Sequence, residues 1–143
     1  MAKTICKILG IVFILVGILG FLAPGLMGMH LSLAHNLVHI ISGALALYFG
    51  FAGTLAGARL FCIVFGVVYL LLGVAGFLAG GGGSHTVTGV PAAHHGGGDS
   101  SLLAVLPGSL ELASVDHLVH VLLGIVFLIG GFLTKADVHR AVD

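Results

Sequence analysis

The chain has 143 residues, of which 59% are hydrophobic and 7% are charged, and its formal net charge is zero. Soluble domains carry roughly a quarter of charged residues, so this composition excludes an ordinary soluble protein and predicts that much of the surface faces the lipid bilayer. The few basic residues are scattered and form no patch, which excludes nucleic acid as a partner.

Four apolar runs are long enough to cross a bilayer, which takes about 20 residues of α-helix. They cover residues 5–23, 33–52, 60–79 and 115–134. Apart from Lys7, near the start of the first run, none of them contains Lys, Arg or Glu, and their only carboxylate is Asp116, at the edge of the fourth run. The sequence therefore predicts an all-α protein: an integral membrane four-helix bundle that forms a single membrane domain.

The basic residues predict how the chain lies across the membrane. All five lie near a terminus or in the link between the second and third runs: Lys3, Lys7, Arg59, Lys135 and Arg140. Short segments rich in Lys and Arg stay on the cytoplasmic side. We therefore expect both termini in the cytoplasm and residues 80–114 in an outer loop.

Two residue offsets relate the first half of the chain to the second. An offset of 56 aligns Cys6 with Cys62 and brings three glycines of the first run onto three of the third: Gly10 and Gly66, Gly17 and Gly73, Gly20 and Gly76. An offset of 81 aligns His39 with His120. The pattern predicts two tandem transmembrane hairpins that enter from the same side, related by a pseudo-twofold axis along the membrane normal.

The difference between the offsets, 81 − 56 = 25 residues, measures an insertion in the outer loop of the second hairpin. This loop, residues 80–114, is rich in glycine, which favours a flexible coil. Residues 102–106 are apolar but too short to span, and they stop at Pro107 and Gly108. We expect this short segment to lie at the outer interface or against the helix ends.

We assign a packing role to the glycines and no chemical role to the two cysteines. Helices in lipid associate through close contact of small side chains, so we interpret the glycines as packing surfaces, either within the bundle or towards partner proteins. Cys6 and Cys62 lie near the cytoplasmic side, where thiols stay reduced, and we expect no disulfide.

A candidate site lies at the outer ends of the second and fourth runs. His35 and His39 are spaced i, i+4, while Asp116, His117 and His120 fall within two turns, so each group shares one helical face. The pseudo-twofold relation pairs His39 with His120, His35 with Asp116, and Asn36 with His117. Imidazole binds zinc, copper and iron, and a carboxylate commonly orients it.

Three interpretations of this site stay open. In the first, His39 and His120 bind haem or a chlorophyll-type pigment, or a Zn or Cu ion is held by a larger set: His35, His39, Asp116, His117 and His120, with His30, His85, His94 and His95 as further candidates. In the second, which we favour, no cofactor is bound and the polar residues fix the register of neighbouring helices. The third is proton handling or catalysis.

Local signals at the helix starts fit the structural interpretation. Ser32 and Ser114 are expected N-caps, and Asp116 suits a first turn, where a negative charge meets the helix dipole. No serine, cysteine or lysine lies in a recognisable nucleophile motif, and the run 80–83 lacks the GK[ST] of a phosphate loop. We therefore expect no enzymatic activity.

Several polar landmarks resemble those of a known family. They are His35-Asn36-x-x-His39-x-x-x-Gly43, Ala58-Arg59, Gly66-Val67-Val68-Tyr69-Leu70-Leu71 and Asp116-x-x-x-His120-x-x-x-Gly124. The pattern resembles a bacterial family of small four-span membrane proteins, domain of unknown function 4383, over nearly the whole chain apart from the glycine-rich insertion. The resemblance implies the four-span fold and a multi-pass place in the bacterial inner membrane. It implies no reaction.

The expected function is that of a non-enzymatic accessory or structural subunit, which packs against other membrane helices in a larger complex. The alternative is a membrane protein that binds haem, a metal or a pigment through the paired histidines near the outer face.

Overall fold

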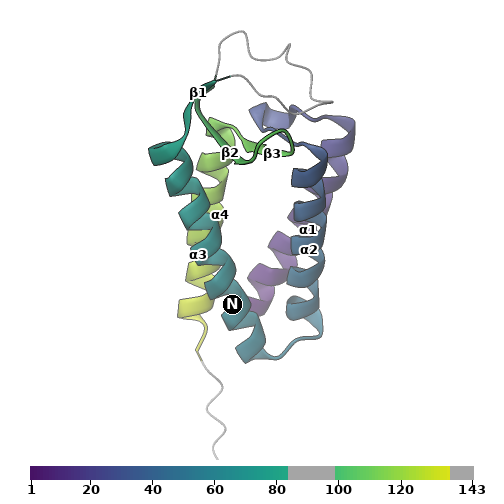
Figure 1. The fold of residues 1–143 in the computed structure, drawn as a ribbon. Coiled ribbons are helices and arrows are strands. Elements are labelled where there is room, and N and C mark those ends of the chain that lie inside the picture. Colours follow the sequence, from purple (N-terminus) through teal and green to yellow (C-terminus); the bar gives the residue numbers. More distant parts are fainter. Residues whose placement is uncertain (84–98, 136–143) are drawn as a thin grey trace, which may run out of the picture.

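Long apolar sequences without proline form four α-helices in the computed structural model, which describes residues 1–83 and 99–135 (Figure 1). The helices are α1 (Ala2–Leu22), α2 (Leu33–Phe51), α3 (Leu55–Ala79) and α4 (Ser114–Leu133). Each is long and apolar enough to cross a membrane. The predicted four-helix membrane bundle is confirmed, and the chain is a multi-pass membrane protein.

Two helices begin earlier than the apolar runs indicate. Helix α1 starts at Ala2 rather than residue 5, and α3 starts at Leu55 rather than residue 60. The start of α3 is set by Thr54, whose hydroxyl accepts a hydrogen bond from the backbone N–H of Gly57 at 3.0 Å. A capped helix need not stop where its apolar run stops, so hydropathy alone places these ends too late.

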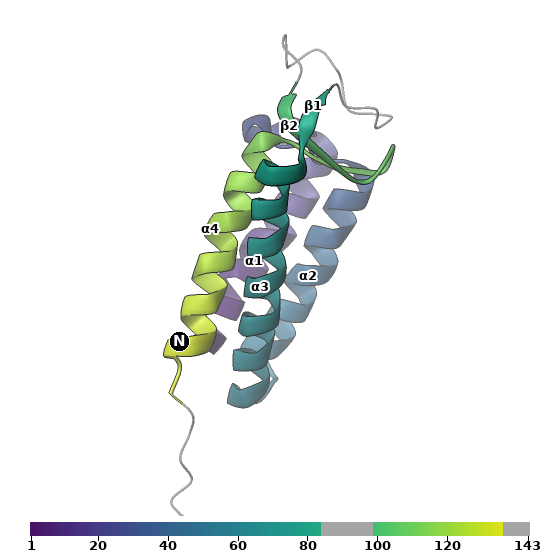
Figure 2. The same cartoon turned by 60° about the vertical axis from the view of Figure 1, so that its left-hand side comes forward.

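The helices pair as two hairpins, α1 with α2 and α3 with α4, which lie side by side (Figures 1 and 2). Glycine allows the close approach within each hairpin. A Cβ atom on Gly10 would lie 2.8 Å from the Leu47 side chain, and one on Gly66 would lie 2.7 Å from that of Leu128. These glycine surfaces are therefore used inside the hairpins.

The same contacts recur in both hairpins at the offsets of 56 and 81 residues. Gly17 lies against the backbone carbonyl of Asn36, and Gly73 lies against that of His117. Gly43 lies against α1 as Gly124 lies against α3. Each of these glycine contacts in the first hairpin thus has its counterpart in the second.

Larger side chains join the two hairpins along the bundle axis. Near the ends of the helices that lie away from the sheet, the Cys6 and Cys62 Sγ atoms are 3.5 Å apart as free thiols. Further along, Phe13 stacks on Tyr69 with ring centroids 5.5 Å apart. Phe127 lies beside both rings, at 6.0 and 6.1 Å, and completes an aromatic layer in the centre of the bundle.

A small antiparallel sheet forms a cap at the end of the bundle opposite Cys6 and Cys62, with strand order β1-β2-β3. The strands are β1 (Gly81–Gly83), β2 (Asp99–Leu106) and β3 (Leu110–Leu112), and Figure 1 shows them across the helix ends. Strands β2 and β3 meet at a tight turn in which Gly108 has φ 74°. The short 3₁₀ helix η1 (Leu26–Gly28) lies between α1 and α2.

The sheet corrects one sequence expectation. Residues 80–114 were expected to form a flexible glycine coil, but Gly81 pairs with Leu102 and β2 pairs with β3. The apolar segment 102–106 does lie against the helix ends, as expected, where β2 contacts α3 and α4. Glycine costs entropy in a strand, yet its N–H and C=O groups pair like any others when a partner strand lies alongside. The rest of that loop, residues 84–98, lies outside the described residues.

Candidate functional site

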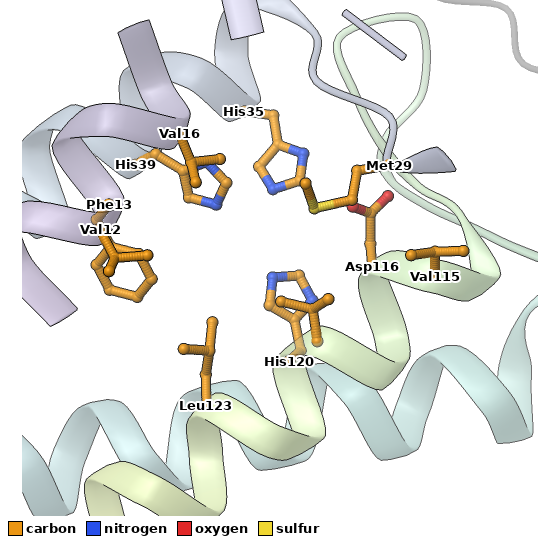
Figure 3. A pocket seen from close by; sticks show the side chains of 11 residues that line it. Val12, Phe13, Val16, Met29, His35, His39, Val115, Asp116, His120 and Leu123 are labelled. Carbon is orange, nitrogen blue, oxygen red and sulfur yellow. The ribbon is translucent and has the colours of Figure 1, made fainter. Parts of the chain in front are cut away.

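Three imidazoles gather between the hairpins, just beneath the cap formed by the sheet. The His35 ring lies 4.4 Å from the His39 ring and 6.1 Å from the His120 ring, measured between centroids. All three side chains are at least 95% buried. In Figure 3 they turn towards a common space, with the Asp116 carboxylate beside them.

A backbone carbonyl fixes the orientation of His35. Its Nδ1 lies 2.8 Å from the carbonyl oxygen of His30. A carbonyl oxygen can only accept, so Nδ1 carries the proton and donates it. In the neutral ring the other nitrogen, Nε2, is then an acceptor, so this histidine presents a lone pair to its neighbours.

Asp116 connects the two hairpins through backbone amides. Its Oδ2 accepts hydrogen bonds from the N–H of Ala113 at 2.7 Å and from the N–H of His30 at 3.0 Å. The first bond caps its own helix, α4, and the second reaches the segment that precedes α2. A carboxylate that is 1% exposed therefore serves as a shared cap for both hairpins.

The expected helix caps are confirmed at one end and wrong at the other. Ser32 is the N-cap of α2, and its Oγ accepts from the N–H of His35 at 3.2 Å. Ser114 was expected to cap α4, but the N-cap residue is Ala113 and the helix begins at Ser114. The capping bond is made by another residue, Asp116, which lies two positions after Ser114. Its carboxylate is a stronger acceptor than a hydroxyl and accepts the hydrogen bond from the N–H of Ala113.

His117 and Asn36 lie outside the imidazole cluster. Each packs against a glycine of the other helix in its own hairpin, His117 against Gly76 and Asn36 against Gly20. Each also donates to a backbone carbonyl: His117 Nε2 to that of Ser101, and Asn36 Nδ2 to that of Leu31 at 3.3 Å. The two residues therefore fasten strand β2 and the segment before α2 to the helices.

Two cavities flank the imidazole cluster. The first holds about 220 Å³ and lies between α1 and α4, while the second holds about 230 Å³ and lies between α2 and α3. His35, His39 and His120 line both cavities, and Asp116 lines only the first. Figure 3 looks into the first cavity.

The two cavities have corresponding walls. Val12, Phe13 and Val16 of α1 line the first cavity, and the residues 56 positions later, Val68, Tyr69 and Leu72 of α3, line the second. Their aromatic members extend the histidine layer: Phe13 stacks on His39 at 5.7 Å, and Tyr69 lies 5.2 Å from His120. Neither ring was among the predicted site residues, although the offset of 56 aligns Phe13 with Tyr69.

The five predicted metal ligands come only partly together. His35, His39, Asp116 and His120 line one cavity, and His117 does not. In residues 1–83 and 99–135, no three or more His, Cys, Asp or Glu side chains are grouped so that they could hold a metal ion. His85, His94 and His95 lie outside the described residues. The metal and cofactor hypotheses stay predictions.

Removing the Asp116 carboxylate should destabilise the protein. Asp116→Ala leaves two buried N–H donors without an acceptor, and each costs about 1–3 kcal/mol. Asp116→Asn keeps one acceptor oxygen and should lose less than half as much. Thermal unfolding in detergent measures the loss, and amide exchange should rise at His30 and Ala113. An Asp116→Ala variant as stable as the parent protein, with unchanged exchange at both amides, would contradict the shared cap.

Comparison with known proteins identifies the family of this chain. The sequence model of a family described as Domain of unknown function (DUF4383) matches residues 3–96. The match takes in α1 to α3 but not α4, so it covers less of the chain than the resemblance in the sequence suggested. No curated protein and no solved structure gives a significant match. Since the matched segment is well over half of the chain, this protein belongs to the DUF4383 family of unknown function.

Proposed function

We propose that this protein is a non-enzymatic integral membrane subunit that acts by packing against other membrane proteins. The proposal depends on how the side chains are divided between the inside and the outside of the bundle. All four helices present large apolar side chains outwards: Ile18, Ile41, Leu71 and Leu122 are each at least half exposed. An apolar outer face suits either lipid or the apolar face of another helix.

The polar side chains turn inwards and bond to the protein's own backbone. Asp116 holds two amides, and His35 and His117 each reach a carbonyl. Ser32 donates to the carbonyl of Ser109 at 2.7 Å, which fastens the turn after β2 to the start of α2. Groups occupied in this way hold the outer cap on the helices, and this use favours a structural role.

We also propose that the two hairpins are tandem copies of one unit. The recurrence of glycine contacts at two fixed offsets supports this origin, as does a mutual pair of thiol contacts. Cys6 Sγ lies 3.9 Å from the carbonyl oxygen of Ala58, and Cys62 Sγ lies 3.8 Å from that of Ala2. The offset of 56 relates Cys6 to Cys62 and Ala2 to Ala58, so each thiol contacts the alanine carbonyl of the other hairpin in the same way.

The end of the bundle opposite the sheet is proposed to face the cytoplasm of a bacterial cell, across its inner membrane. Basic side chains gather there. Lys7 Nζ lies 4.6 Å from the centre of the Phe51 ring, and Arg59 Nε donates to the carbonyl of Gly131 at 3.3 Å. Lys3 lies one turn from Lys7, and Lys135 follows the end of α4. A positive end of this kind favours the cytoplasmic side.

Thiol labelling in intact cells tests the orientation. In a background that lacks both native cysteines, Ser109→Cys at the sheet turn should react with a membrane-impermeant maleimide added outside. Lys135→Cys should react only after the membrane is permeabilised. The opposite pattern would place the termini outside and overturn the orientation.

Photo-crosslinking in native membranes tests the subunit role. A photoreactive residue is placed at one of the outward positions Ile18, Ile41, Leu71 or Leu122, with the fully buried Phe127 of α4 as the matched control. At least one outward position should give a discrete adduct with another membrane protein, and Phe127 should give none. Lipid adducts alone at all four outward positions would show that the bundle has no stable protein neighbour.

A further inference from the structure

The two lateral cavities have features of a binding site that the structural role does not use. Their mouths lie on the sides of the bundle, within the spanning helices. The valines at these mouths are themselves exposed, Val12 by 40%, Val38 by 43% and Val68 by 47%. Side chains exposed at this depth face lipid, so a ligand would enter from the bilayer.

The lining of both cavities is almost wholly apolar, and the imidazoles of His35, His39 and His120 are the part of the lining that the two cavities share. The Nδ1 atoms of His39 and His120, which correspond at the offset of 81, are buried and have no hydrogen-bond partner. A buried polar group without a partner costs about 1–3 kcal/mol. His39 and His120 line both cavities, and a neutral imidazole has one donor and one acceptor, so their rings can bind a group that both donates and accepts.

The walls define the rest of the ligand. Apart from the histidines, the first cavity is lined by valines, Phe13, Met29, Leu123 and the Asp116 carboxylate, and the second by apolar side chains with Ser42 and the Tyr69 ring. No Lys or Arg lines either cavity. A phosphate head would therefore lack a counter-charge, whereas a neutral oxygen needs none.

We propose that each cavity binds a neutral, single-chain amphiphile drawn from the bilayer, with a hydroxyl head at the imidazoles of His39 and His120 and its apolar chain between the hairpins. The hydroxyl both donates and accepts, as the rings require, and the slim chain suits cavities of about 220 and 230 Å³. This site goes beyond the proposed subunit role and does not depend on it.

Tyrosine fluorescence gives a direct test, because the chain has two tyrosines and no tryptophan. Tyr69 lines the second cavity, and Tyr48 is exposed on α2. In Tyr48→Phe protein reconstituted in lipid vesicles, which contain no other protein, the emission reports on Tyr69 alone. The probes are a long-chain alcohol with a bromine at its far end, which quenches nearby rings, and the bromoalkane of the same length.

The alcohol should quench Tyr69 in a saturable way, and the bromoalkane should give only a weak linear effect. Replacing both His39 and His120 by Leu should raise the half-saturating concentration about tenfold or more, as expected for the loss of a bond worth about 1.4 kcal/mol. Equal quenching by both probes, or an unchanged concentration in the double variant, would overturn the proposal.

Two variants at adjacent positions of α3 provide a second test that does not depend on the folding of the histidine variant. Val68→Phe fills the mouth of the second cavity and should abolish the saturable quenching. Val67 is the neighbour of Val68 on α3 and lines neither cavity. In the Val67→Phe variant the alcohol should therefore quench Tyr69 as it does in the parent protein. Saturable quenching that survives Val68→Phe would place the alcohol elsewhere and overturn the site.

Discussion

The close approach of helices through glycine is the constraint on which the rest of this structure depends. In lipid there is no hydrophobic force to drive helices together, so dispersion contacts at short range must hold them. Gly124 allows α4 to lie so near α3 that a Cβ there would be 2.7 Å from the backbone nitrogen of Leu70. Gly43 does the same for α1 and α2, at 2.8 Å from the carbonyl oxygen of Gly10.

This division of small and large side chains produces the site. Most of the helical glycines pack within a hairpin, although Gly130 of α4 lies against Ile5 of α1. The hairpins meet each other mainly through bulkier groups along the axis: the thiols of Cys6 and Cys62, the aromatic rings of Phe13 and Tyr69, and the imidazole cluster. These bulky groups hold the two hairpins apart, which leaves space between the helices on either side of the axis. Cavities therefore flank the axis at the histidines, and Asp116 joins the hairpins at the end next to the sheet by bonding to both of them.

Much of the fold followed from the sequence because it depends on local and periodic signals. Apolar runs of span length predict the helices, and the offsets of 56 and 81 predict which residues correspond. The helix starts at Ala2 and Leu55 and the sheet were not predicted. Pairing of Gly81 with Leu102 is a non-local contact, and a glycine run carries no strand pattern that could reveal it.

The candidate site was predictable in its members but not in its connections. The spacing of His35 and His39 placed them on one face, and Asp116 was expected in a first turn. Its second partner, the amide of His30, is 86 residues away and is a backbone group, which no side-chain pattern can indicate. The same holds for His117, whose spacing matches the cluster although its ring turns towards Gly76.

The unfolding free energy of glycine variants in detergent is the most direct measure of the close-packing constraint. Gly43→Ala and Gly124→Ala should each lose about 1–3 kcal/mol, the usual cost of overpacking, and the two losses should be similar because the positions correspond. Gly25→Ala is the matched control, since a Cβ there meets nothing within 4 Å, and it should leave stability unchanged. Gly43→Ala and Gly124→Ala variants as stable as Gly25→Ala would show that glycine contact does not hold the hairpins together.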